Sequence, residues 1–249
     1  MRSNKIFTRF LIMVAILVLS VVLYMKQTKD SNTINNVIDS KNEDRSVFKE
    51  KTEEIVPVFS NNRLTEENIR RIDGMSWKTE APVKLDDLRY IKVTYWGFDD
   101  KAHLGELVVH KEVSNEVIEI FKELYEVKFQ IDKIKIIDEY NADDNLSMED
   151  NNTSSFCFRV VAGTNKLSKH SYGLAIDINP IQNPYIKGEV ILPAEGETYV
   201  DRSNVRKGMI VKDDACYKAF TNRGWAWGGE WKTVKDYQHF EKNVDLRKN

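Results

Sequence analysis

One long apolar segment near the start of the chain limits what the chain can be. Phe10 to Met25 is almost unbroken apolar sequence, and as a helix these 16 residues span about 24 Å. That length is slightly short for a hydrocarbon core of about 30 Å, but the flanking Arg9 and Lys26 can extend toward the interface. The 249-residue sequence has no second run of this kind, which excludes a polytopic membrane protein.

The charges around this segment predict its orientation. Arg2, Lys5 and Arg9 precede the run, so the positive-inside rule keeps the N-terminus in the cytoplasm and places the body of the protein outside. The exit from the run has no A-x-A cleavage pattern and no lipoprotein cysteine. We therefore expect residues 1–26 to be an uncleaved single-pass anchor in the cell membrane, with a cleaved signal peptide and secretion as the alternative.

The composition argues against a nucleic-acid partner. The chain has 37 basic and 39 acidic residues, a net charge of −2. The first 26 residues carry four cations and no acid, so the rest holds 33 basic and 39 acidic residues, a net charge of −6. Two cysteines, Cys157 and Cys216, are too few for a disulfide framework, and one bridge or two free thiols both stay open.

The remaining sequence divides into a polar stalk over residues 27–62 and a folded domain over residues 63–249. The expected helices run from Glu66 to Ile72 behind Thr65, from Ser114 to about Val127, and from Asp213 or Asp214 to Gly224. The expected strands are 88–96, 104–110, 134–137, 173–179 and 236–241, with a polar loop at 141–155 and a long insertion at 183–209. Because helices and strands do not alternate regularly, we predict an α+β fold with a mostly antiparallel central sheet and flanking helices.

Two of the four histidines lie in segments that suggest a metal site. His170 precedes a glycine turn, and Asp177 lies on the strand that follows, whose alternation puts Leu174, Ile176 and Ile178 on the opposite face. A carboxylate in such an apolar strand is costly unless a cation or hydrogen-bond donors meet it. His170 and Asp177 are therefore candidate zinc ligands, and His239 is the candidate third.

Two imidazoles and one carboxylate leave a zinc ion with an open position, which is typical of a catalytic site. Asp236 is the candidate general base, with Glu230 and Glu241 as competing carboxylates. Positions i and i+3 of a strand face opposite ways, so Asp236 must lie on a turn before the strand of His239. The alternatives are that the histidines are structural and that Asp177 caps a loop or pairs with Arg159.

Taken together, these segments resemble the M15 peptidases, which are zinc D-alanyl-D-alanine carboxypeptidases and L-alanyl-D-glutamate endopeptidases of bacterial cell walls and phage lysins. Residues 168–177 resemble the family signature S-x-H-x-x-G-x-A-x-D, and residues 236–240 resemble the branch with D-x-x-H-F. Residues 74–77, 147–153, 177–185 and 224–229 also resemble that branch. The resemblance covers about residues 65–242 and implies the fold shared by M15 peptidases and hedgehog domains.

The resemblance also implies roles. His170, Asp177 and His239 would bind one zinc ion, and Asp236 would be the base. Arg159 would hold the substrate carbonyl and stabilise the oxyanion. The alternatives are that Arg159 forms a salt bridge with Asp177 or a loop acid, and that Lys166 or Lys169 is the relevant cation.

The expected function is hydrolysis of an amide in the peptidoglycan stem peptide, at the L-Ala–D-Glu or the D-Ala–D-Ala bond. The alternative function is a zinc-stabilised binding module without turnover, because the hedgehog domain uses this fold to bind partners. The tryptophans at 225, 227 and 231 are expected to pack in the core or to line the cleft. His103 and His110 are not expected to be ligands, and the insertion at 183–209 either shapes a substrate groove or serves as scaffold.

Overall fold

The computed structural model describes residues 56–246. The predicted anchor and residues 27–55 of the predicted stalk lie outside the described residues. Within residues 56–246, no helix combines the length and the apolar character needed to cross a membrane.

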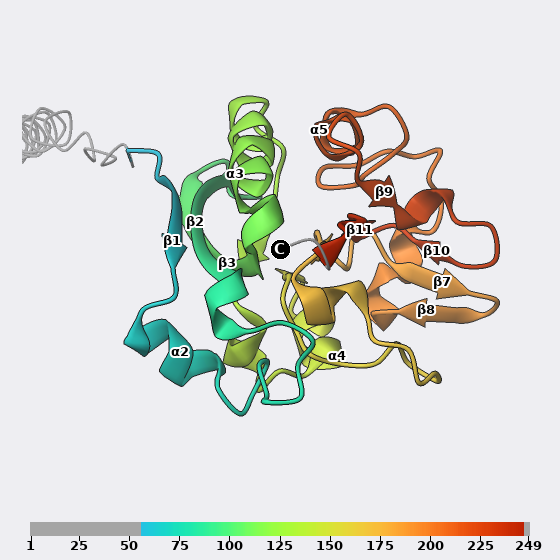
Figure 1. The fold of residues 1–249 in the computed structure, drawn as a ribbon. Helices are drawn as coiled ribbons and strands as arrows, with labels where there is room; N and C mark the ends of the chain where they lie inside the picture. The colour runs from blue at the N-terminus through green and yellow to red at the C-terminus, as the bar shows by residue number, and fades with distance from the viewer. Residues whose placement is uncertain (1–55, 247–249) are drawn as a thin grey trace, which may run out of the picture. The chain divides into compact units, whose positions relative to one another are not determined.

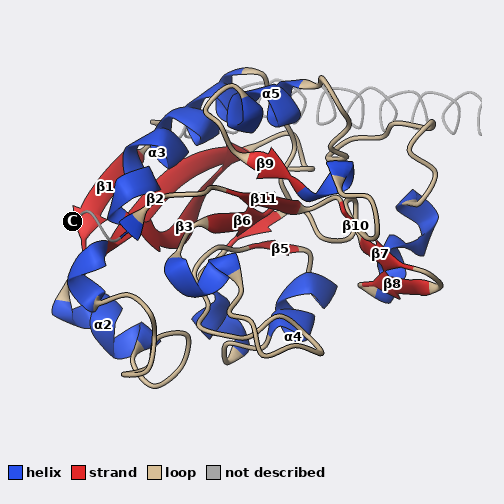
Figure 2. Ribbon diagram, turned by 45° about the vertical axis from the view of Figure 1, so that its right-hand side comes forward, coloured by secondary structure: helices blue, strands red, loops and turns tan. Residues whose placement is uncertain are grey.

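The described residues form a mixed α+β fold built from small sheets (Figures 1 and 2). The α-helices are α2 (Glu66–Ile72), α3 (Lys111–Glu126), α4 (Asp144–Glu149) and α5 (Ala215–Thr221). The strands are β1 (Phe59–Arg63), β2 (Leu88–Trp96), β3 (Ala102–His110), β4 (Lys133–Ile134), β5 (Asn152–Thr153), β6 (Ala175–Asp177), β7 (Tyr185–Lys187), β8 (Val190–Leu192), β9 (Ala226–Trp227), β10 (Lys235–Asp236) and β11 (His239–Glu241). Five short 3₁₀ helices are η1 (Leu85–Asp87), η2 (Ile137–Tyr140), η3 (Lys169–Tyr172), η4 (Ala194–Tyr199) and η5 (Gly228–Glu230).

The sheets differ from the single central sheet that the sequence predicts. Within residues 56–246, three antiparallel sheets of three strands have the orders β1-β2-β3, β6-β11-β9 and β10-β7-β8, and β4 pairs with β5 in parallel. Antiparallel pairing is correct, but the strands after β3 are two or three residues long and do not extend the first sheet. Strands of two or three residues are too short to form one wide sheet, so several small sheets and the helices together enclose the hydrophobic core.

The hydrophobic core lies between α3 and the strands. α3 packs on β2 and contacts α5, and Figure 2 shows α3 and α5 on one side of the strands with α4 on the other. Phe121 of α3, Ile176 of β6 and Phe240 of β11 belong to one buried cluster. Phe220 of α5 stacks on Phe240, with ring centroids 4.0 Å apart. The strands that carry Asp177 and His239 are therefore anchored from behind by the main core.

Several predicted boundaries are corrected. β1 pairs with β2 from Phe59 to Arg63, so the folded part begins before the predicted boundary at residue 62. The segment 141–155, predicted as a loop, contains α4 and β5, because Asp143 caps α4 by accepting hydrogen bonds from the backbone of Asn145 and Leu146. Helix α3 begins at Lys111 and not at Ser114, because His110 provides its cap. The helix 66–72 and the strand 88–96 are confirmed.

Candidate metal centre and active site

Three short elements bring His170, Asp177 and His239 together. His170 lies on η3, Asp177 ends β6, and His239 begins β11, directly opposite Asp177 in the antiparallel pair. Gly173 ends η3 with a φ of +65°, and a Cβ added there would lie 2.6 Å from the backbone nitrogen of His110. Glycine is therefore needed where the chain turns from His170 into the strand of Asp177.

The three side chains converge on one buried point. His239 Nδ1 lies 2.8 Å from Asp177 Oδ1, and His170 Nε2 lies 3.0 Å from Asp177 Oδ2. The two ring nitrogens are 3.2 Å apart. The three potential ligand atoms all lie within 4.8 Å of one another, and all three residues are buried. This arrangement matches the donor set that the sequence nominates for a metal.

The outer ring nitrogens fix which atoms face inward. His170 Nδ1 lies 2.5 Å from the carbonyl oxygen of Ser155, which can only accept, so Nδ1 carries the hydrogen and Nε2 points at Asp177. His239 Nε2 lies 3.3 Å from a carboxylate oxygen of Glu241, which likewise leaves Nδ1 facing inward. A histidine that donates its second N–H to a carbonyl or carboxylate is the usual arrangement of a metal ligand.

The charges within this group also suit a cation. Burial by itself would raise the pKa of Asp177, but His170 and His239 outweigh burial and lower it. Burial by itself would lower the pKa of His239, but Asp177 outweighs burial and raises it to about 10. The buried carboxylate thus holds positive charge at the point where the three side chains meet, which is where a metal ion would lie.

Asp236 lies beside this group on a different sheet. The predicted strand 236–241 is broken at Tyr237 and Gln238, so Asp236 is in β10, which pairs with β7, while His239 is in β11, which pairs with β6. Because Asp236 and His239 lie on different strands, their spacing of three residues does not by itself put them on opposite faces of one strand. The carboxylate oxygen Oδ1 of Asp236 is buried and has no hydrogen-bond partner among the described residues.

The surroundings of Asp236 are suited to a proton acceptor. Burial, with a further contribution from Asp177, raises the pKa of Asp236 to about 7. The backbone of Asp236 packs against Gly228, where an added Cβ would lie 2.5 Å from the carbonyl oxygen of Asp236. The competing carboxylates already have partners: Glu230 accepts from Tyr217 and pairs with Lys212, and Glu241 accepts from the candidate ligand His239.

Arg159 approaches the site from the loop before η3. Its guanidinium forms an ion pair of 2.9 Å with Asp144 of α4, which is the loop-acid pairing that the sequence left open. Its backbone nitrogen donates to Ser171 Oγ at 2.9 Å, which ties the loop to η3. Burial lowers the pKa of Arg159, but Asp144 and then Asp177 outweigh burial and raise it, so the cation is close to both carboxylates. Its Nε is buried without a partner among the described residues.

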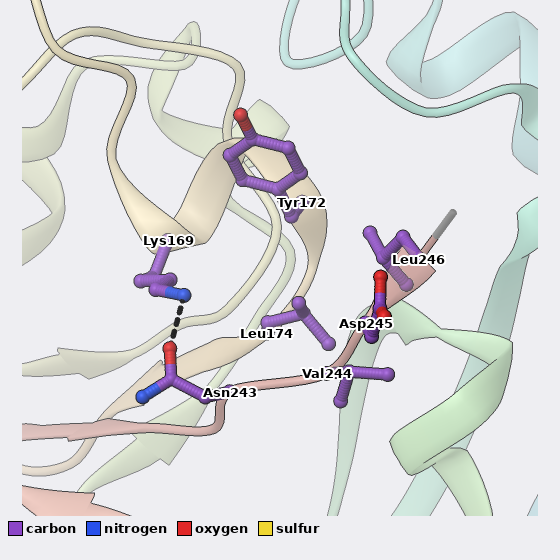
Figure 3. Close-up of a pocket in the computed structure, with 7 residues that line it drawn as sticks. All are labelled: Lys169, Tyr172, Leu174, Asn243, Val244, Asp245 and Leu246. Atoms are coloured by element: carbon purple, nitrogen blue, oxygen red, sulfur yellow. Dashed lines mark hydrogen bonds between the residues drawn. The ribbon is translucent and has the colours of Figure 1, made fainter. Parts of the chain in front are cut away.

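The other candidates lie outside this constellation. His103 contacts Asp99, and His110 caps α3, so neither joins the group. Lys166 is exposed, and Lys169 donates to Asn243 beside an open pocket of about 430 Å³, none of whose lining residues is His170, Asp177 or His239 (Figure 3).

The tryptophans and cysteines have separate outcomes. Trp225 and Trp227 are in the core, whereas the half-buried ring of Trp231 packs on His239 with centroids 5.4 Å apart. Cys157 and Cys216 are both free and buried. The possible bridge is therefore absent, and the two-thiol alternative is correct.

Sequence reasoning missed three neighbours of the candidate site residues. The carbonyl of Ser155 has no side-chain signature, and Asp144 lies in a segment predicted as a loop. Tyr185 of β7 lies directly opposite Asp236 in β10, which only the strand register reveals. An N-cap pattern at Asp143 was the one signal from which α4, and so the position of Asp144, could have been found.

One comparison with known proteins found a match that includes these residues. Residues 162–242 match a family model described as D-alanyl-D-alanine carboxypeptidase. That segment contains the group His170, Asp177 and His239, and also Asp236, whereas Arg159 lies just before it. The matched segment, 81 of the 249 residues, is similar to peptidases of that family. Searches of curated proteins and of solved structures found no match.

Proposed function

We propose that this chain is a zinc peptidase that hydrolyses an amide bond of the peptidoglycan stem peptide outside the cell membrane. The observation that carries the proposal is the convergence of His170 Nε2, Asp177 and His239 Nδ1 beside the buried, unpartnered carboxylate oxygen of Asp236. The family match supports a peptidase of the cell wall at the level of the family.

His170, Asp177 and His239 would hold the ion. A bound zinc ion would supply Lewis-acid polarisation of the scissile carbonyl and a water of lowered pKa. Asp236 would accept the proton of the attacking water and pass it to the leaving amine. Arg159, oriented by Asp144, would face the oxyanion that develops on the carbonyl oxygen.

Two bonds remain candidates within this reaction class. The D-x-x-H-F pattern at residues 236–240 favours L-Ala–D-Glu, and the description of the matching family names the D-Ala–D-Ala carboxypeptidase. We propose the L-Ala–D-Glu endopeptidase first. The predicted anchor would restrict cleavage to the nearby wall, and the predicted stalk would set the reach of the domain.

The test is product analysis with the full-length chain. Zinc-loaded protein is incubated with a defined stem pentapeptide, and the products are weighed by mass spectrometry. A split after the first alanine identifies the endopeptidase, and loss of one terminal alanine identifies the carboxypeptidase. We expect Asp236→Ala to lower the rate by about 10² to 10⁴-fold, since a general base contributes that much.

A matched control is Glu230→Gln, which removes a carboxylate that is engaged with Tyr217 and Lys212. We expect it to cleave at the wild-type rate. Cleavage that survives both Asp236→Ala and chelation would rule out the zinc–base assignment. A folded, metal-bound chain that binds the peptide without cleaving it would instead favour the binding module.

A further inference from the structure

A row of side chains leads from Asp236 across the insertion. In the sheet β10-β7-β8, Asp236 lies directly opposite Tyr185, and Tyr185 lies directly opposite Leu192. Residues directly opposite in antiparallel strands point to the same face of the sheet. Tyr185 and Leu192 therefore share the face of the candidate base, and Figure 1 shows the three strands side by side.

That face is the more open one. Leu192 is 39% exposed, and the next pair on the same face is Lys187 and Val190, of which Val190 is 53% exposed. Tyr185 is half-buried, and its phenol makes no hydrogen bond with the described residues. The raised pKa of Tyr185, caused by burial and then by the charge of Asp236, agrees with the phenol lying near that carboxylate. A half-buried aromatic side chain and an exposed apolar one thus lie in line with the base.

The base of the hairpin is held firmly. Asn183, fully buried, accepts from the backbone of Ile210 and donates to the carbonyl of Gly208. The guanidinium of Arg202 donates to Asn183 and lies 4.4 Å from the centre of the ring of Tyr237, the residue after Asp236. The row is therefore aligned with Asp236 before any ligand arrives, which lowers the cost of binding along it.

From this register we propose that Tyr185 and Leu192 bind the longer of the two peptide segments that flank the cleaved bond, called here the long side of the substrate. The insertion at 183–209 would then select substrates by the length of that segment. The inference rests on the proposed function and deepens it. Neighbouring strands are about 4.8 Å apart, so Leu192 lies about 10 Å from Asp236, which corresponds to about three residues of extended peptide. Leu192 would then contact a substrate only beyond its second residue from the cleaved bond.

The experiment couples two variants to substrate length. The substrates are the stem pentapeptide and a tripeptide that keeps the cleaved bond and only two residues on its long side. We expect Leu192→Ser to raise KM for the pentapeptide about fivefold with kcat within about twofold, because part of an apolar contact is lost. The tripeptide should show no change with this variant, whereas Tyr185→Ala should raise KM for both substrates.

The matched control is Val205→Ser, which changes an exposed valine of the same insertion outside the three strands and should alter neither substrate. Thermal unfolding of all variants should match the wild type. Pentapeptide binding to Asp236→Ala, measured by calorimetry, should weaken by the same factor when Leu192→Ser is added.

Each outcome decides the inference. Unchanged KM and binding for Leu192→Ser, or an equal change for both substrates, would overturn it while the proposed function stands. If the wild type binds the pentapeptide without cleaving it and Leu192→Ser weakens binding, the proposed peptidase activity is wrong. The role of Tyr185 and Leu192 in peptide binding is then still supported. A chain that neither binds nor cleaves the pentapeptide refutes both.

Discussion

At the scale of single residues, the two candidate histidine ligands are oriented in different ways. Ser155 holds the ring of His170 through a backbone carbonyl, which no substitution of its side chain removes. Glu241 holds the ring of His239 through a charged side chain, which a substitution can change. The orientation of His239 is therefore the one that a variant can test without touching a ligand.

We expect Glu241→Gln to weaken zinc binding by about tenfold, because the partner of a ligating histidine fixes its ring and raises its basicity. The amide oxygen can still accept the hydrogen bond, so the fold should be unaffected. Competition with a chromophoric chelator measures the affinity. Glu230→Gln serves as the control and should bind zinc as the wild type does; equal affinities for both variants would contradict the role of Glu241.

The site residues show what sequence could and could not predict. Residue type, spacing and a family resemblance predict four site residues: His170, Asp177, His239 and Asp236. In the fold, the potential ligand atoms of the first three lie within 4.8 Å of one another. Asp144 was missed because its partner Arg159 is 15 residues away and no local pattern links them. Tyr185 was missed because its position depends on the register of strands about 50 residues apart.

At the scale of elements, the start of α3 depends on an unusual cap. The buried ring of His110 accepts a hydrogen bond from the backbone nitrogen of Glu112 through Nδ1 at 3.2 Å. Only a neutral imidazole can accept this bond. Burial lowers the pKa of His110 in the folded state, so the fold favours the neutral ring.

The lowered pKa of His110 makes the stability of the fold depend on pH. Below the unfolded-state pKa of about 6.5, the unfolded chain takes up a proton more readily than the folded one, so stability falls as pH falls toward the folded-state pKa. His110→Asn keeps a cap acceptor without titrating, and we expect a smaller loss of unfolding free energy between pH 7 and 5. Urea denaturation at several pH values measures the unfolding free energy. The same dependence of that free energy on pH in the wild type and in His110→Asn would contradict the prediction.

The elements that sequence predicted best are those with long local patterns. Helix α2 has a capping box in which Thr65 and Asn68 bond to each other's backbone, and six of the nine residues of β2 are β-branched or aromatic. The break between β10 and β11 could not be seen, because its cause is the pairing of each piece with a different strand. Pairing partners are a property of the tertiary fold and leave no mark on a six-residue window.

At the scale of the whole described region, the candidate metal centre joins parts of the chain that are far apart in sequence. His170 and His239 are 69 residues apart, and β11 also carries Phe240 into the main core. An ion bound by these residues would therefore link η3, β6 and β11 in the folded state only.

We expect zinc at 100 times its dissociation constant to raise the free energy of unfolding by about 2.7 kcal/mol. For a region of this size, that corresponds to a rise in Tm of roughly 5 to 10 °C. Differential scanning calorimetry with zinc, with magnesium and with a chelator measures the shift. His239→Ala should show none, and an equal shift in that variant would place the stabilising ion elsewhere.

The insertion after β6 leaves and rejoins the body of the molecule at one neck, where Asn183 meets Ile210. The entropy of closing a loop grows only with the logarithm of its length, so the far end of this loop can gain or lose residues at little cost. The contact between Asn183 and Ile210 also fixes the direction in which the loop leaves the strands that carry Asp177 and His239. The chemical step and the choice of substrate would thus be encoded in separate stretches of sequence, which can change independently in the course of evolution.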